Sequence, residues 1–78
     1  MKNLKGRYIK YLKGNWGTGN YPIGSFHLVD KGSSFVYWVI DCNGNRNFCS
    51  LVDRIKDGEF ELMPEGFIPN QQLNYVLF

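Results

Sequence analysis

The stretch that decides the fold runs from Ser34 to Leu51 and reads SFVYWVIDCNGNRNFCSL. Its first half, Phe35–Ile40, consists only of β-branched and aromatic residues, which fit the pleated surface of a strand. Asn43-Gly44 follows, and both residues tolerate the positive φ angles of a type I′ turn. Such a dipeptide between two strand-like segments predicts a β-hairpin.

A two-residue turn at Asn43-Gly44 fixes which residues of the two strands face each other. Asp41 is then opposite Arg46, a cross-strand charge pair worth roughly 0.2–1 kcal/mol. Val39 is opposite Phe48, which brings a β-branched and an aromatic side chain together on the same face as Asp41. Because these pairs are chemically favourable, we expect this register.

The same register separates Cys42 from Cys49, the two cysteines of the chain. At ~3.3 Å per residue they lie about 13 Å apart, whereas a disulfide needs Cα atoms within about 7 Å of each other. Free thiols are typical of a reducing cytosol. We therefore expect no intramolecular disulfide and a cytoplasmic protein.

Length and composition describe one small domain, residues 1–78. Aromatic residues make up 17% of the chain and nine residues are Gly, which favours β structure with tight turns over a helical bundle. The formal net charge of +2 is far below the basic excess of a typical nucleic-acid-binding domain. No stretch approaches the ~18 consecutive apolar residues of a membrane span, and no apolar region follows the basic start as in a signal peptide. We therefore expect no membrane association.

Shorter segments complete the predicted fold. Three of them are expected to be strands, with Ile9 and Tyr11 of the first strand facing the core, although the alternation of polarity is blurred in the second. Another is expected to form one short helical or 3₁₀ turn with Asp53 as its cap. The predicted strands are Gly6–Lys13, Ser25–Asp30 and Glu59–Met63, the predicted helical segment is Val52–Gly58, and the turn after the second strand is Lys31-Gly32-Ser33.

The segment Gly14–Gly24 is a loop, because four of its eleven residues are Gly and Pro22 lies near its end. It nevertheless carries Trp16 and Tyr21. Large aromatic side chains on such a loop either fold back over the core or face a partner.

The order of these parts resembles that of small SH3-like β-barrels. The segments GRYIKYL, YPIGSFHLV and FELMPEG carry the resemblance, with the long loop in the place of the RT loop and Asn43-Gly44 in that of the distal loop. More narrowly, GRYIKYL, PIGS and ELMPEGF resemble short proteins encoded by bacteriophages. The resemblance covers residues 4–68. It implies an all-β barrel of about five strands with a short 3₁₀ segment. The C-terminal extension over 69–78 departs from such a minimal barrel. The paired aromatic residues with which SH3 domains bind proline-rich peptides are not cleanly present, so we do not infer that ligand.

The C-terminal extension ends in Leu73–Phe78, which carries no charged side chain and has high β propensity. Left free, such a segment promotes aggregation. We therefore expect it to add a strand to its own sheet, to cover the barrel or to form the edge of a homo-oligomer.

The sequence gives little support for an enzyme. His27 is the only histidine, and we interpret it as a partly exposed structural residue on a strand. Together with Cys42 and Cys49 it provides too few ligands for a closed zinc site, so we expect no metal and no cofactor. Two candidates remain. The carboxylates Glu59, Glu61 and Glu65 are explained as well by a solvated strand edge. The loop Asn15–Gly19 contains glycines but lacks the Lys-Ser/Thr of a phosphate-binding loop.

A binding function has more support. Five basic residues lie within the first thirteen, next to aromatic ones. Proteins that bind single-stranded nucleic acid or nucleotides combine these two types, since basic groups bind phosphate and aromatic rings stack on bases. A solvated, soluble strand explains the same lysines equally well. The competing partner is a protein, since Trp, Tyr and Arg dominate interface hot spots. The basic stripe is Lys2, Lys5, Arg7, Lys10 and Lys13. The candidate binding residues are Trp16, Tyr21 and Arg46 or Arg54 for a protein, and Tyr8, Lys10 and Arg7 with Trp16 and Tyr21 on the adjoining loop for nucleic acid.

The sequence therefore predicts a small non-catalytic binding protein. The bacteriophage resemblance implies an accessory factor in the host cytoplasm that binds and modulates a host protein, with antiviral defence among its possible settings. The alternatives are a nucleic-acid or nucleotide binder and a structural component of the virion.

Overall fold

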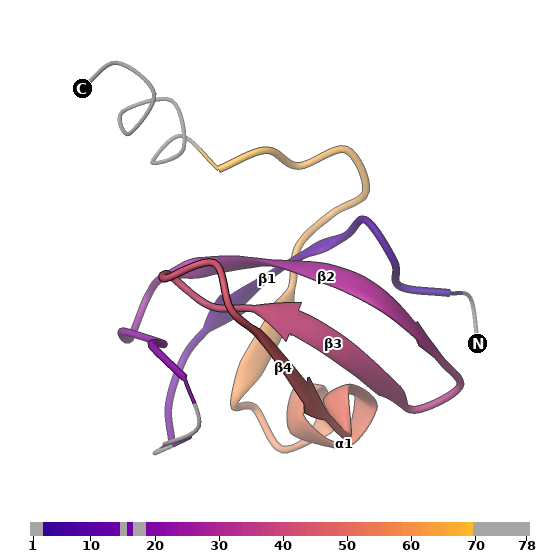
Figure 1. Ribbon diagram of the computed structural model, residues 1–78, viewed down its shortest axis with the longest axis horizontal. Helices are drawn as coiled ribbons and strands as arrows, with labels where there is room; N and C mark the ends of the chain where they lie inside the picture. Colours follow the sequence, from indigo (N-terminus) through magenta and orange to yellow (C-terminus); the bar gives the residue numbers. More distant parts are fainter. Residues whose placement is uncertain (1–2, 15, 17–18, 70–78) are drawn as a thin grey trace.

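Five antiparallel strands and one short helix form the part of the chain that the computed structural model describes, residues 3–14, 16 and 19–69 (Figure 1). The strands lie in one open sheet in the order β4-β3-β2-β1-β5, so β5 returns to the free edge of β1. The prediction of an all-β fold with about five strands is confirmed. The elements are β1 Tyr8–Tyr11, β2 Phe26–Ser33, β3 Val36–Ile40, β4 Arg46–Cys49, α1 Leu51–Lys56 and β5 Phe60–Leu62.

One face of the sheet, called the inner face below, carries the core. In β1 the alternation of polarity has the predicted result, because Ile9 and Tyr11 are buried. The short helix α1 lies against one end of this face and buries Leu51 and Val52 there (Figure 1). Removing each such side chain from water stabilises the fold by about 1.5–3 kcal/mol. The sheet residues that complete the core are Val29, Tyr37, Val39, Cys49 and Phe60.

The predicted hairpin forms, but its predicted register is wrong by one residue. Trp38 lies opposite Phe48, and Ile40 lies opposite Arg46. Since side chains alternate between the two faces of a strand, a shift of one residue exchanges the faces. The expected pair of Val39 with Phe48 is therefore absent, because Val39 is buried whereas Phe48 is 52% exposed.

The register follows from the turn, which is longer than the two residues predicted. The backbone N–H of Gly44 donates to the carbonyl of Asp41 at 3.0 Å, and the N–H of Asp41 donates to the carbonyl of Asn45 at 2.9 Å. Gly44 has a φ of 85°, but Asn43 does not have a positive φ. This is a type I turn followed by a left-handed glycine, a common three-residue hairpin loop. The side chain of Asp41 fixes it by accepting hydrogen bonds from the N–H groups of Asn43 and Asn45, both at 2.9 Å.

β2 continues through the segment that was predicted to be a turn. Lys31-Gly32-Ser33 belongs to the strand, and the chain reverses at Ser34, which has a φ of 57°. The pairing of β2 with β3 is irregular between Val29 and Gly32. Gly32 lies so close to the backbone of Tyr37 that a side chain there would collide with it. A bulge at a glycine therefore lets the strand continue where the sequence suggested its end.

The helical segment was predicted in the right place but with the wrong cap. α1 begins at Leu51, after Ser50, and Asp53 lies in its first turn. An acidic residue there is favourable because it faces the positive end of the helix dipole. The predicted end of the segment is confirmed, since Asp57 is the C-cap residue of α1 and Gly58 follows with a φ of 79°.

After β5 the chain turns at Pro64–Phe67 and crosses the outer face of the sheet. The ring of Phe67 lies 5.0 Å from that of Phe26 and 6.4 Å from that of Tyr8. The expectations for Leu73–Phe78 lie outside the described residues. In the described ranges, no helix is long and apolar enough to cross a membrane.

Candidate functional site

The loop between β1 and β2 borders an open groove of about 370 Å³, called the loop groove below. The loop lies at the same end of the molecule as the turn between β3 and β4 (Figure 1). Pro22 and Ile23 form an exposed part of its wall, and the side chain of Ile23 is 63% exposed. The described residues that line the groove are Tyr11, Gly14, Trp16, Gly19, Asn20, Tyr21, Pro22 and Ile23.

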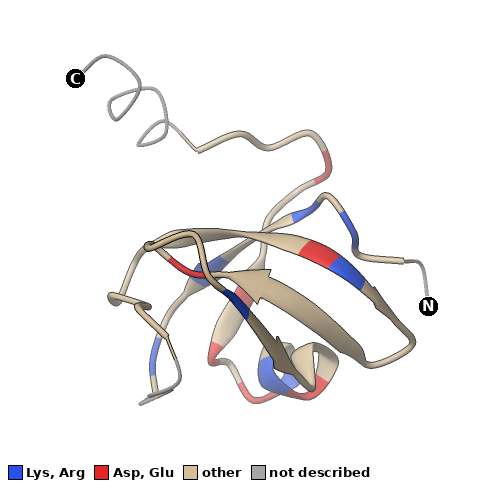
Figure 2. Ribbon diagram, in the orientation of Figure 1, with Lys and Arg blue, Asp and Glu red and all other residues tan. Residues whose placement is uncertain are grey.

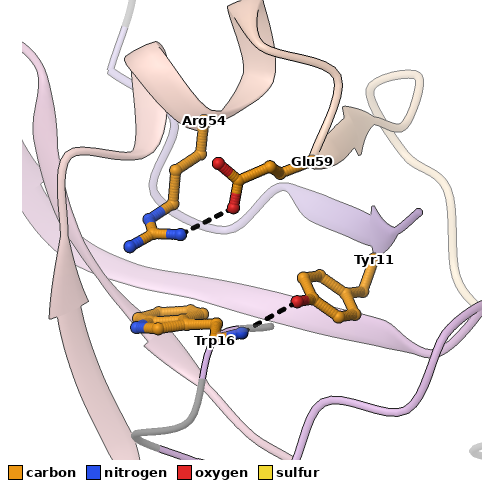
Figure 3. Close-up of polar contacts among 4 residues, drawn as sticks. All are labelled: Tyr11, Trp16, Arg54 and Glu59. Atoms are coloured by element: carbon orange, nitrogen blue, oxygen red, sulfur yellow. Dashed lines mark hydrogen bonds and ion pairs between the residues drawn. The ribbon is translucent and has the colours of Figure 1, made fainter. Parts of the chain in front are cut away.

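The two predicted aromatic residues of the loop lie together in this groove. The rings of Trp16 and Tyr21 are stacked, with centroids 4.4 Å apart and an interplanar angle of 13°. Both rings pack edge-on against Phe60 of β5, at 5.8 Å and 6.3 Å. The backbone N–H of Trp16 also donates to the hydroxyl of Tyr11 at 3.1 Å (Figure 3). The loop therefore folds back over the core, while Trp16 stays half-buried and in reach of the groove.

Arg54 of α1 brings a positive charge to the same aromatic group. Its guanidinium lies over the ring of Trp16, 4.6 Å from the centroid (Figure 3). Its Nη1 atom also pairs with Oε1 of Glu59 at 2.7 Å. Gly14 permits this arrangement, because a Cβ atom at that position would lie 3.2 Å from the same carboxylate oxygen. The guanidinium is thus held by a carboxylate and by the aromatic face of Trp16, which is itself one of the residues that line the loop groove.

The hydroxyl group of Tyr21 is buried and anchors the side chain to the sheet. It donates to the carbonyl of Val39 at 3.3 Å and accepts a hydrogen bond from the side-chain amide of Asn47 at 2.9 Å. Burial raises the pKa of Tyr21, and the hydrogen bond from Asn47 opposes that effect only partly. The phenol is therefore neutral and can serve as both donor and acceptor.

Asp41 ties the loop to the hairpin. Its Oδ2 atom accepts a hydrogen bond from the backbone N–H of Asn20 at 2.9 Å, and the N–H of Cys42 donates back to the carbonyl of Asn20 at 3.0 Å. Burial opposes the charge of Asp41, which is 6% exposed, but the hydrogen bonds from three backbone N–H groups hold its pKa below the ordinary value. Gly19 is required next to this carboxylate, because a Cβ atom there would collide with it and with Tyr21.

His27 lies beneath the turn that follows Tyr21, and the expectation that it is partly exposed is wrong. Its side chain is 2% exposed and its ring packs edge-on against Tyr21 at 4.7 Å. Its Nδ1 atom lies 2.9 Å from the carbonyl of Ile40, and its Nε2 atom lies 2.6 Å from the hydroxyl of Ser25. Burial lowers the pKa of His27, and the hydrogen bond to Ile40 and the charge of Asp41 oppose this only partly.

The other predicted binding residues lie away from the loop groove. Arg46 pairs with Asp30 at 3.4 Å instead of with Asp41, which the shifted register turns away from it. Lys10 projects from β1 on the outer face with its ammonium 5.8 Å from the ring centroid of Phe26. Tyr8 lies on that face too, next to Phe67.

The basic stripe is not gathered into one surface in the described chain. The guanidinium of Arg7 donates to the carbonyl of Met63 at 2.6 Å and so holds the chain after β5. Lys10 lies opposite Glu61 across the pairing of β1 with β5. Figure 2 shows Lys and Arg interleaved with Asp and Glu over the ribbon, and Lys2 lies outside the described residues.

The two cysteines lie in different environments. Cys42 is exposed in the hairpin turn, whereas Cys49 is buried, and both are free thiols. Burial raises the pKa of Cys49 to about 11, although the neighbouring Arg54 acts in the opposite direction. Within residues 3–14, 16 and 19–69, no group of three His, Cys, Asp or Glu side chains is arranged to hold a metal ion.

Several residues that shape the groove were missed from the sequence. One signal was present, since Asp-Cys-Asn-Gly at 41–44 has Asp at the first and Gly at the fourth position of a type I turn. The role of His27 had no local signal, because its partner carbonyl, that of Ile40, lies thirteen residues away. The role of Ser25 was missed although its partners Pro22 and His27 are close in sequence.

Comparisons of the chain with protein-family models, with curated proteins and with solved structures found no match. The resemblance to SH3-like and bacteriophage proteins therefore stays a prediction from the sequence. The function has to be inferred from the groove and its chemistry.

Proposed function

We propose that this protein acts without catalysis, by binding a segment of a partner protein in the loop groove. The observation that carries the proposal is the preassembled group of Trp16, Tyr21 and Arg54, in which stacking and an ion pair already fix each side chain. Trp, Tyr and Arg supply most of the binding energy in protein interfaces. Side chains that are fixed before binding lose less conformational entropy when a partner arrives.

The shape of the groove favours a short apolar segment. Its volume of about 370 Å³ lies near the lower end of the ~300–1,000 Å³ usual for ligand sites. Pro22 and Ile23 offer an apolar wall, and Asn20 offers polar groups beside it. An extended segment with one or two large apolar side chains fits these surroundings.

The finer fold and setting belong to the same proposal. We infer an SH3-like barrel, which is supported by the strand order, the long loop after β1 and the short helix before β5. On the bacteriophage resemblance of residues 4–68 we propose an accessory factor of the host cytoplasm that modulates a host protein. Nucleic-acid binding has less support, because Arg7 is committed to Met63 and the charges of both signs are interleaved.

Two matched variants test the proposal in a pull-down from bacterial lysate. Ile23 in the groove wall and Ile68 after β5 are 63% and 66% exposed, so Ile23→Asp and Ile68→Asp make the same change at equally exposed positions. We expect the wild type and Ile68→Asp to capture the same protein, and Ile23→Asp to lose about tenfold in affinity, or ~1.4 kcal/mol.

Half of each lysate is treated with nuclease, because contacts to phosphate would depend on nucleic acid. A protein that is captured equally by both variants would exclude the loop groove as its site. Bands that vanish on nuclease treatment would indicate that the protein binds nucleic acid through its basic residues.

A further inference from the structure

We propose that the protonation state of His27 regulates the loop groove, because it decides which acceptor the hydroxyl of Ser25 bonds. The inference rests on the function proposed for the groove, which it deepens. Ser25 closes the turn that carries Pro22 and Ile23, the exposed wall of the groove.

The contacts of His27 fix the protonation of its Nδ1 atom. The carbonyl of Ile40, 2.9 Å away, can only accept a hydrogen bond, so Nδ1 must carry a proton. Nε2 lies 2.6 Å from Oγ of Ser25 and can either accept from that hydroxyl or donate to it. The direction of this second bond is therefore set by the charge of the ring.

The hydroxyl of Ser25 has one proton and two possible acceptors, Nε2 of His27 and the carbonyl of Pro22, which lies 2.5 Å from Oγ. When His27 is neutral, the hydroxyl donates to Nε2 and the carbonyl of Pro22 loses that bond. When the ring takes up a proton from solvent, Nε2 donates to Oγ, and the hydroxyl turns to donate to Pro22. One proton gained by the histidine thus adds one hydrogen bond across the turn.

This turn connects to the groove at several points. The N–H of Ser25 donates to the carbonyl of Pro22 at 3.0 Å, and the N–H of Gly24 donates to the carbonyl of Tyr11 at 2.6 Å. The ring of His27 also lies edge-on to Tyr21, which is stacked on Trp16. A stronger bond at Ser25 therefore fixes the wall of the groove relative to its aromatic floor.

The groups around His27 determine at which pH its ring takes up the second proton. Asp41, from the turn after β3, faces His27 with a charge that favours protonation, and Tyr21 faces it from the loop. β1 presents the apolar Ile9 opposite the histidine. Burial is the largest influence and lowers the pKa of His27 below the ordinary value of 6.5. Below that lowered pKa the wall is held by one hydrogen bond more than above it, and there a partner should bind about threefold to tenfold more tightly.

An NMR titration between pH 4 and pH 8 tests the device without any ligand. The ring nitrogens of His27 should titrate below 6.5, and the amide signals of Ile23 and Gly24 should follow the same midpoint. In Ser25→Ala the histidine should still titrate while the amides of Ile23 and Gly24 no longer follow it. The variant His27→Gln is the control. It lacks the imidazole, so its amide signals should show no transition near the histidine midpoint, and any pH-dependent shifts that remain come from carboxylates.

Two results would overturn the proposal. One is a histidine in the folded protein that does not change its charge down to pH 4, and the other is a titration that leaves Ile23 and Gly24 unmoved. The pull-down at one pH below and one pH above the midpoint found for His27 adds the functional readout, because the wild type should gain more capture below it than Ser25→Ala does. Equal gains would overturn regulation of the groove, whereas equal capture by Ile23→Asp and Ile68→Asp would contradict the groove itself.

Discussion

Two of the aromatic pairs in the molecule each contain a tryptophan, and they differ in what holds them in place. Trp16 and Tyr21 lie 4.4 Å apart on the loop, and Trp38 and Phe48 lie 4.9 Å apart across the hairpin on the outer face. The loop pair is held by a hydrogen bond that Tyr21 donates to β3, by one that it accepts from β4, and by the guanidinium of Arg54. The outer pair is placed by strand register alone, and half of Phe48 faces solvent.

This difference indicates why an excess of aromatic residues does not by itself locate a binding site. A cross-strand aromatic pair contributes mainly to sheet stability, roughly 0.2–1 kcal/mol. A loop that holds a tryptophan over its own core has to be fixed by polar partners, since glycines leave its backbone many alternatives. Buried polar groups that surround an aromatic pair are therefore the better sign of a preorganised surface.

The largest effect is expected from removing the polar support of the loop. Asp41→Ala should lower the free energy of unfolding by about 3 kcal/mol. Hydrogen bonds to a charged group are worth about 1.5–3 kcal/mol each, and Asp41 accepts three of them from backbone N–H groups, but the cost of burying its charge offsets a large part of their sum. Urea denaturation followed by tryptophan fluorescence measures the loss. A loss below about 1 kcal/mol would mean that water replaces the carboxylate and that the loop does not depend on it.

The wild type gives an independent check of the same residue through pH. Folding lowers the pKa of Asp41, so its contribution is complete above the ordinary value of 3.8 and is lost as the pH falls through the folded value. Stability measured against pH should therefore decline more steeply below 3.8 in the wild type than in Asp41→Ala. Parallel curves for the two proteins would show that another carboxylate causes the decline.

Asp41 also shows how far the fold could be predicted from the sequence. Alternation was enough for Ile9 and Tyr11, because one buried face leaves a period-2 pattern in the strand itself. The hairpin register was not, since Asn43-Gly44 fits both a two-residue and a three-residue loop. The buried carboxylate of Asp41, which also bonds the distant Asn20, decides between them.

The candidate site was only partly predictable for a similar reason. Aromatic residues on a glycine-rich loop pointed to Trp16 and Tyr21 directly. Arg46 was grouped with them, yet the shifted register pairs it with Asp30 on another face. The burial of His27 depends on contacts outside its own strand, such as that with Ile40 of β3, and contacts of that kind leave no local pattern in the chain.

A medium effect is expected when the anchor is removed and the aromatic ring is kept. Tyr21→Phe preserves the stack on Trp16 but leaves the carbonyl of Val39 and the amide of Asn47 without the phenol. We expect a loss of about 1–2 kcal/mol in unfolding free energy and weaker capture of the partner protein, because the wall and floor of the groove are less fixed. Unchanged stability and capture would mean that ring stacking alone organises the loop.

The smallest effect is expected on the outer face. Phe48→Ala removes one ring of the pair with Trp38 and leaves the hydrogen bonds between β3 and β4 in place. Since Phe48 is 52% exposed, the loss should be about 0.5 kcal/mol, the worth of a cross-strand pair. The same denaturation experiment measures it, and pull-down with the variant should capture as much partner as the wild type. If Phe48→Ala abolished capture while Ile23→Asp did not, the outer face would be the interface, and the polar support of the loop would serve stability alone.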